Sequence, residues 1–456
     1  MAMGRRRREQ QGSLWVATGE LPLAAAHPFY ERIDRILNEH GFDEFVEKQC
    51  RRFYAAKMGR PSLPPAVYFR LLLIGYFEGI DSERGIAWRI ADSLGLRRFL
   101  GYGLTDGTPD HSTISRNRRL IDVETHEAVF TWVLGVLTKA ELLKGKTVGV
   151  DATTLEANAA MRSIVRKDSG ESYQAFLEGL AEASGIQTPT REDLAKLDKS
   201  RKNKASNKDW ENPFDPDAKI TKMKDGRTHL AHKAEHAVDM ETGAVVAVTL
   251  QPADRGDTSS IQPTVEQVDK NLVAVMRDGE ACDKLSEQVL REAVADKGYH
   301  SNGVLGWFGG HEMRTYISEP DRGRRQWKGD SEAQQSVYGN RRRIRGRRGK
   351  SLMRKRGELV ERSFAHCYDT GGMRRTHLKR RDNILKRLLV HVAGFNLSLI
   401  LRKLFGWGTA RGLQGLVARV FAASERLWRR LLDVLARLVD YMTIRINTTS
   451  AVSIAA

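Results

Sequence analysis

The stretch Thr147-Val-Gly-Val-Asp151 is a short apolar run that ends in an aspartate. A second run, Ala293-Val-Ala-Asp296, ends in another aspartate and continues as Lys-Gly-Tyr299. Apolar runs of this length, rich in valine and bounded by turn residues, are typical of buried strands. We therefore expect Asp151 and Asp296 to stand at the ends of two strands.

A third acidic residue, Glu361, lies in the helix-like segment Gly357-Glu-Leu-Val-Glu361-Arg-Ser-Phe364. Two carboxylates on strands and one on a helix can converge around two divalent cations, which activate a water or hydroxyl and stabilise a leaving oxygen. Hard oxygen ligands favour Mg²⁺, with Mn²⁺ as a substitute. Glu358 is a rival third ligand, because it lies on a neighbouring part of the same helical face. The set predicts an enzyme that cuts or joins nucleic acid.

The composition agrees with a polyanionic partner. The net charge is +18 and the pI is about 9.8, which favours nucleic acid as the ligand. Cys50, Cys282 and Cys367 are far apart, so neither a disulfide framework nor a zinc knuckle is indicated. The arginine-rich N-terminus has no apolar run after it, and the segment from Ile384 to Phe405 is interrupted by basic residues. We expect a cytoplasmic protein without a membrane span, associated with the nucleoid when bound to DNA.

Changes in periodicity divide the chain. Residues 1–20 form a basic tail, and residues 21–135 have helical spacing, which predicts an all-helical DNA-binding domain of the helix-turn-helix type. Short β-rich runs alternate with helix-like segments over 145–405, which predicts an α/β domain with a mixed sheet flanked by helices. Residues 406–456 read as a C-terminal helical extension. The expected strands are Thr147–Asp151, His229–Asp239, Ala244–Leu250, Glu292–Asp296 and Thr315–Ser318, and the expected helices between them are Thr264–Met276 and Asp283–Leu290.

Two polar stretches interrupt the α/β domain. The insertion 161–228 is rich in Lys, Asp, Asn and Ser, and we expect it to be helical over Glu171–Ala183 and otherwise mobile. The segment 322–356 ends in a run of Lys and Arg that leads directly into the helix of Glu361. Asp254 and Asp257 lie in a loop that follows a strand and could approach the three acids, but we interpret them as turn residues.

Positive charge marks two candidate DNA contacts. Asp110-His-Ser-Thr-Ile-Ser-Arg-Asn-Arg-Arg-Leu120 predicts a helix, with Thr108 as its N-cap, whose polar face could enter a groove or lie along the phosphates. The basic run before Glu361, and Lys297 beside Asp296, could capture a phosphate-bearing substrate in a salt-dependent way. The alternative is a solvated basic surface. The candidate DNA-binding residues are Ser112, Ser115, Arg116, Arg118, Arg119, Lys297, Arg341, Arg342, Arg343, Arg345, Arg354, Arg356 and Arg362.

With their flanks, the three acids resemble the DDE transposases of bacterial insertion sequences, whose catalytic domain is ribonuclease H-like. The resemblance extends from about Pro61 to Trp407. Its specific motifs are Pro109-Asp-His-Ser-Thr-Ile-Ser-Arg, Val150-Asp-Ala-Thr-Thr-Leu-Glu-Ala-Asn, Ala295-Asp-Lys-Gly-Tyr and Gly357-Glu-Leu-Val-Glu-Arg-Ser-Phe-Ala-His. In that family the two Asp lie on the first and fourth strands and the Glu on a late helix, the order seen here.

The resemblance implies a transposase with two metal ions at Asp151, Asp296 and Glu361. Such an enzyme binds the terminal inverted repeats of its element, cleaves there, and uses the freed 3′-hydroxyl to attack target DNA. It also implies a homodimer on double-stranded DNA, because two ends must be held together. Many relatives carry an Arg and a Lys where this chain has Gly357 and Tyr368. Two alternatives stay open: a DNA-binding regulator or decayed transposase without catalysis, and a ribonuclease H-like nuclease that does not transfer strands.

Overall fold

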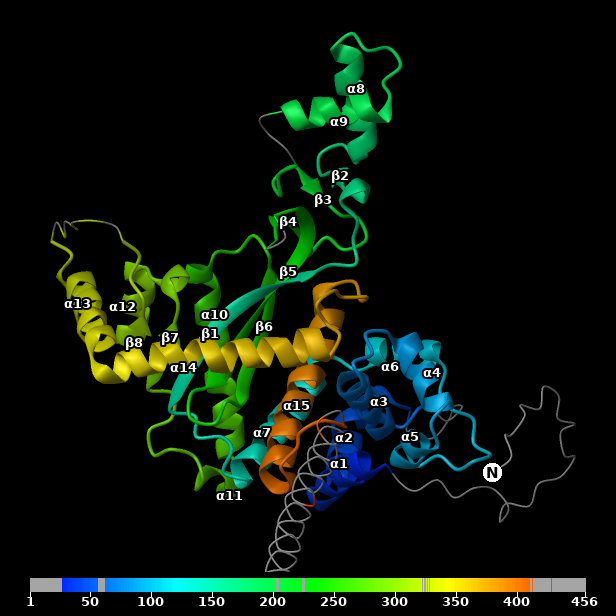
Figure 1. The fold of residues 1–456 in the computed structure, drawn as a ribbon, viewed down its shortest axis with the longest axis vertical. Helices are drawn as coiled ribbons and strands as arrows, with labels where there is room; N and C mark the ends of the chain where they lie inside the picture. Colours follow the sequence, from blue (N-terminus) through cyan, green and yellow to red (C-terminus); the bar gives the residue numbers. More distant parts are fainter. Residues whose placement is uncertain are drawn as a thin grey trace, which may run out of the picture.

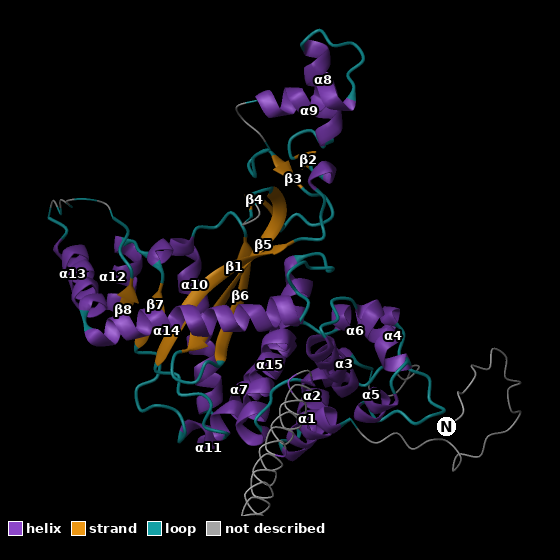
Figure 2. Ribbon diagram, viewed as in Figure 1, coloured by secondary structure: helices purple, strands orange, loops and turns teal. Residues whose placement is uncertain are grey.

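A mixed β-sheet lies at the centre of the larger part of the computed structural model (Figures 1 and 2). The structure describes residues 27–55, 62–201, 205–223, 226–321, 323, 325, 327, 329–410, 412 and 428. Within these residues the sheet has the order β4-β5-β1-β7-β8, and β6 pairs with β5 beyond the end of β4. The bounds of the strands are β1 Thr147–Glu156, β4 Lys219–Lys222, β5 Thr228–Asp239, β6 Val245–Pro252, β7 Glu292–Ala295 and β8 Arg314–Ile317.

The directions of the strands define the fold class. β1 runs antiparallel to β5 and parallel to β7, and β7 runs parallel to β8. The hairpin between β5 and β6 turns at Met240–Gly243, as the sequence predicts. This mixed sheet with helices on both faces confirms the predicted ribonuclease H-like α/β fold. One boundary was wrong: β1 continues to Glu156, so Asp151 lies in the middle of a strand.

Two helices cover opposite faces of the sheet. Glu235 and His236 are neighbours on β5 and so point to opposite faces. Glu235 bonds to Ser260 and Thr264 on α10 (Asp257–Met276), whereas His236 bonds to Ser363 on α14 (Arg347–Phe364). Figure 1 shows α14 crossing the sheet. The predicted helix over Asp283–Leu290 was wrong, because only α11 (Gly279–Cys282) forms there and Leu290 has a positive φ of 48°.

The N-terminal part is all-helical, as predicted. Gly79 ends α3 in the left-handed conformation, with φ of 69°. Asp110, rather than Thr108, caps α6, because its side chain accepts the Ser112 N–H. The helices are α1 Pro28–Glu39, α2 Phe42–Cys50, α3 Pro65–Glu78, α4 Glu83–Ala91, α5 Leu94–Phe99, α6 His111–Leu120 and α7 Val123–Lys139.

The helical part and the sheet share one hydrophobic core. Helix α15 (Arg381–Phe405) packs against α7, α3 and β6, and its apolar residues join a single buried cluster that runs from Phe29 to Trp407. By length and composition α15 could cross a membrane, but 89% of its most apolar window is buried inside the structure. It is a core helix, as expected from its interrupting charges.

The insertion forms an arm with its own small core (Figure 1). It contains α8 (Tyr173–Ala183), α9 (Arg191–Ser200) and a two-stranded sheet of β2 (Val165–Arg166) and β3 (Trp210–Glu211). The expectation of a largely mobile segment was wrong. Trp210 supplies the missing apolar centre, since its ring lies 5.0 Å from Tyr173 and 5.2 Å from Phe176. The predicted basic tail 1–20 lies outside the described residues, and so does the predicted extension 406–456 apart from residues 406–410, 412 and 428.

Candidate active site and nucleic-acid interface

Asp151 lies on β1, close to Asp296, which directly follows the adjacent parallel strand β7. The register pairs Thr147 with Glu292 and Gly149 with Val294, so two further residues along β1 place Asp151 next to Asp296. The Asp296 carboxylate is close enough to contribute to the raised pKa of Asp151. The structure therefore brings together two of the three predicted catalytic acids.

Asp151 faces α14 and contacts a positive charge there. Its Oδ2 accepts a hydrogen bond from Arg356 Nη1 at 2.6 Å, and its Oδ1 accepts the Ala152 N–H at 2.8 Å. Burial raises the pKa of Asp151 above its usual value, although Arg356 acts in the opposite direction. Gly149 allows the helix to approach, because a Cβ there would lie 3.3 Å from Arg356 Cγ. Arg356, predicted to bind DNA, is therefore paired inside the protein.

Asp296 begins the tight turn that follows β7. Its Oδ1 accepts the Gly298 N–H at 2.8 Å, at the start of the short helix η4 (Lys297–Tyr299). Asp257, the first residue of α10, reaches the same turn: a Cβ on Gly298 would overlap the Asp257 carboxylate and lie 3.1 Å from Asp296 Oδ1. The interpretation of Asp257 as a simple turn residue was incomplete, because it lies beside a predicted catalytic acid.

A Gly298→Ala variant is expected to reduce DNA cleavage more than it reduces the stability of the fold. The new methyl group overlaps the end of a flexible side chain, so Asp257 can swing aside at a cost in unfolding free energy of about 1 kcal/mol. That movement breaks its ion pair with Lys233 and disturbs Asp296. We expect at least a several-fold loss of DNA cleavage in an end-cleavage assay. Gly303→Ala, which meets no atom within 4 Å, is the control.

Glu361 is not gathered with the two aspartates. It is exposed on α14, whereas Arg356 reaches Asp151 and Val360 is buried on that helix. Glu361 lies five positions after Arg356 on α14, so the two side chains are about 140° apart around the helix axis. Glu358 is also exposed and pairs with Arg362 at 2.6 Å. Both candidate third acids therefore point away from the side of α14 that faces Asp151.

The carboxylate pair suits a hard divalent cation. Asp151 and Asp296 offer oxygen ligands of the kind that Mg²⁺ and Mn²⁺ prefer, and a cation there would offset the desolvation that raises the pKa of Asp151. Among the described residues, however, no three His, Cys, Asp or Glu side chains are grouped to hold a metal ion. The two aspartates fit the expected cofactor, and among the described residues no third carboxylate is grouped with them.

Helix α6 presents part of its predicted DNA-binding face. Ser112, Arg116 and Arg119 are exposed, and Ser115 is half-buried. Arg118 was expected on this exposed face, and that expectation was wrong. It is buried and donates to Glu83 Oε1 at 2.7 Å, which ties α6 to α4. On α6, therefore, Arg118 has a structural role, whereas Arg116 and Arg119 are exposed.

Arg118→Ala and Arg119→Ala should therefore fail in different ways. Removing Arg118 leaves Glu83, whose side chain is 13% exposed, without its partner and should cost about 3 kcal/mol of unfolding free energy. Removing Arg119 should leave stability within about 0.5 kcal/mol of the wild-type value, weaken DNA binding, and lower the salt slope of binding by about 1. Thermal melts and salt-dependent binding titrations measure both effects. Equal loss of affinity without unfolding in the two variants would contradict this division.

The basic run before Glu361 is helical and partly paired within the protein. It covers the end of α13 (Ser331–Arg345) and the start of α14. Arg341 pairs with Glu319, and Arg343 donates to the Thr315 carbonyl at 2.9 Å. Side chains that the structure leaves exposed are Arg342, Arg345, Arg354, Arg362 and, near Asp296, Lys297. These exposed cations remain the predicted DNA contacts.

Comparison with known families gives two matches to the chain. A family described as Transposase domain (DUF772) matches residues 21–120, which is the helical part, and a family described as Transposase DDE domain matches residues 185–397, which includes most of the sheet and α14. No curated protein sequence matches the chain. The chain belongs to the DDE transposases of insertion sequences, which are DNA-binding, DNA-cleaving enzymes that generally use divalent metal ions.

Proposed function

We propose that the protein cleaves DNA at the terminal inverted repeats of its element and joins the freed 3′-hydroxyl to target DNA. The observation that carries the proposal is the closeness of Asp151, on β1, to Asp296, directly after the parallel strand β7 of a ribonuclease H-like sheet. A homodimer would hold the two ends together.

The chain's own residues supply binding and orientation. Asp151, Asp296 and Glu361 are the proposed catalytic and metal-binding acids, and two Mg²⁺ ions bound there would stabilise charge on the scissile phosphate and activate the attacking oxygen. Lys297 and the exposed arginines of α13 and α14 would hold the phosphodiester backbone. Glu361 can join the aspartates only if α14 rotates or shifts on the sheet, which would also release Arg356 from Asp151. That release places a guanidinium beside the substrate phosphate.

The proposal is tested with linear DNA that carries candidate terminal repeats, a supercoiled target plasmid, and Mg²⁺. End cleavage and joined product are expected, and EDTA should remove both. Specific binding without metal-dependent cleavage would instead indicate a DNA-binding regulator or a decayed transposase. Cleavage without joined product would indicate a ribonuclease H-like nuclease.

A further inference from the structure

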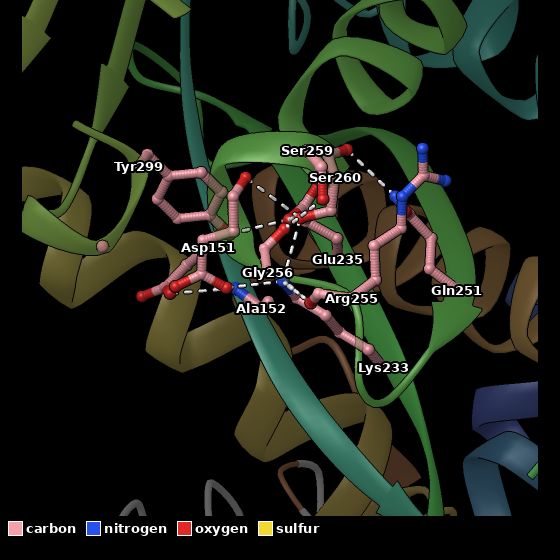
Figure 3. A network of polar contacts seen from close by, with 12 residues as sticks. Asp151, Ala152, Lys233, Glu235, Gln251, Arg255, Gly256, Ser259, Ser260 and Tyr299 are labelled. Atoms are coloured by element: carbon pink, nitrogen blue, oxygen red, sulfur yellow. Dashed lines mark hydrogen bonds and ion pairs between the residues drawn. The ribbon is translucent and has the colours of Figure 1, made fainter. Parts of the chain in front are cut away.

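A buried carboxylate lies on the other side of the sheet from Asp151. Glu235 is on β5, fully buried, and is paired in register with Ala152, the residue after Asp151. Its Oε1 accepts hydrogen bonds from Tyr299 Oη and Ser260 Oγ, both at 2.8 Å, and its Oε2 accepts one from Thr264. Figure 3 shows Tyr299 and Ser260 converging on Glu235. A carboxylate this deep in the fold needs such donors, and here they come from two separate elements.

One of these donors belongs to the turn of Asp296. Tyr299 is three residues after Asp296, its side chain is buried, and its backbone N–H donates to the Asp296 carbonyl at 3.4 Å. Burial and the nearby carboxylates raise the pKa of Tyr299 well above its usual value, so its hydroxyl keeps the proton that it donates to Glu235. The phenol thus ties the turn that carries Asp296 to β5.

A second branch reaches the same turn from α10. Lys233 Nζ donates to Ser260 Oγ at 2.9 Å and to Asp257 Oδ1 at 2.5 Å. Ser260 in turn donates to Glu235, and the Asp257 carboxylate packs against Gly298. Glu235 therefore stands at the junction of two hydrogen-bonded paths. One ends at Tyr299 and the other at Asp257, which packs against Gly298, so both reach the turn that follows Asp296.

We propose that Glu235 is a positioning residue for the DNA-cleavage reaction, which acts through Tyr299 to hold Asp296 beside Asp151. This inference rests on the proposed function. The proposed role accounts for Glu235, a buried acid that is not one of the three predicted catalytic acids. Groups that orient metal ligands in this way are commonly worth 10- to 100-fold in metal affinity or activity.

The chain contains a matched control pair. Tyr316 on β8 donates to Glu292 Oε1 at 3.2 Å, and both residues are buried. Glu292 begins β7, whereas Asp296 follows its other end, so this second tyrosine–glutamate bond lies in the same sheet but away from the site. Tyr299→Phe and Tyr316→Phe each remove one buried hydroxyl and keep the ring.

The test compares wild type, Tyr299→Phe, Tyr316→Phe, Glu235→Gln and the Tyr299→Phe/Glu235→Gln double variant. Hydrogen exchange is measured in peptides that cover residues 296–300, and Mn²⁺ binding is measured by titration without DNA. Tyr299→Phe should speed exchange in this turn and weaken Mn²⁺ binding about 10-fold or more, with cleavage falling in parallel. Tyr316→Phe should change neither, even if it lowers the melting temperature equally. The double variant should be no worse than the single variant with the larger defect, because both changes act on the same Tyr299–Glu235 bond.

The outcomes separate the two proposals. If wild type cleaves DNA but Tyr299→Phe matches Tyr316→Phe in exchange, Mn²⁺ binding and cleavage, the positioning role of Glu235 is wrong and the proposed function stands. If wild type binds Mn²⁺ and shows the Tyr299-dependent exchange but does not cleave DNA, the cleavage function fails while the anchoring of the Asp296 turn stands.

Discussion

An Asp151→Asn variant should bind terminal-repeat DNA at least as tightly as wild type and lose cleavage by roughly 10³-fold or more. The substitution preserves size and one oxygen but removes the charge that would hold a cation, and several kcal/mol of transition-state stabilisation correspond to a loss of about that size. DNA binding should be retained because the change removes a negative charge. It also frees Arg356, which in the wild-type protein pairs with Asp151.

Stability must be measured beside activity for this variant. The Arg356 side chain is 13% exposed, so the loss of its charged partner should cost no more than about 1–3 kcal/mol of unfolding free energy. The matched control is Asp283→Asn, because Asp283 is an exposed acid outside the predicted catalytic set. Retained cleavage by folded Asp151→Asn would remove the main support for the proposed function.

Glu361→Gln should also abolish cleavage and spare DNA binding, while Glu358→Gln should remain active. Glu361 is exposed, so the substitution should alter the unfolding free energy by no more than about 0.5 kcal/mol, and lost activity could not be attributed to unfolding. The expected loss is about 10²-fold or greater, because a missing carboxylate ligand leaves charge on the scissile phosphate uncompensated. Cleavage of labelled end DNA in Mg²⁺ measures it.

The same experiment decides the third ligand. If Glu358→Gln is the inactive variant, the assignment of Glu361 is wrong. If both variants cleave normally, α14 does not supply the third acid, and Asp257, which already lies beside the Asp296 turn, is the next residue to change. Only the second result would remove the need for α14 to rotate on the sheet.

Local patterns in the sequence predicted the elements well and their ends less well. Strands β5 to β8 follow from short apolar runs bounded by turns. β1 extends five residues past its apolar run, because residues 152–156 pair with β5 and α14 covers that side of the sheet. The insertion acquires structure from Trp210 and its aromatic neighbours, which composition alone did not indicate.

Sequence alone identified the candidate residues for the chemistry: two aspartates with their flanking motifs, a helix with two glutamates, and a strong positive charge. These are local properties of residue type and spacing. Only the tertiary structure decided which side chains contact these residues, because the contacting residues come from distant parts of the chain. Asp151 meets Arg356 across 205 residues, Arg118 is buried against Glu83, and Tyr299 of η4 reaches Glu235 on β5. Such pairs form where sheet register and helix packing bring side chains together, and no local periodicity encodes them.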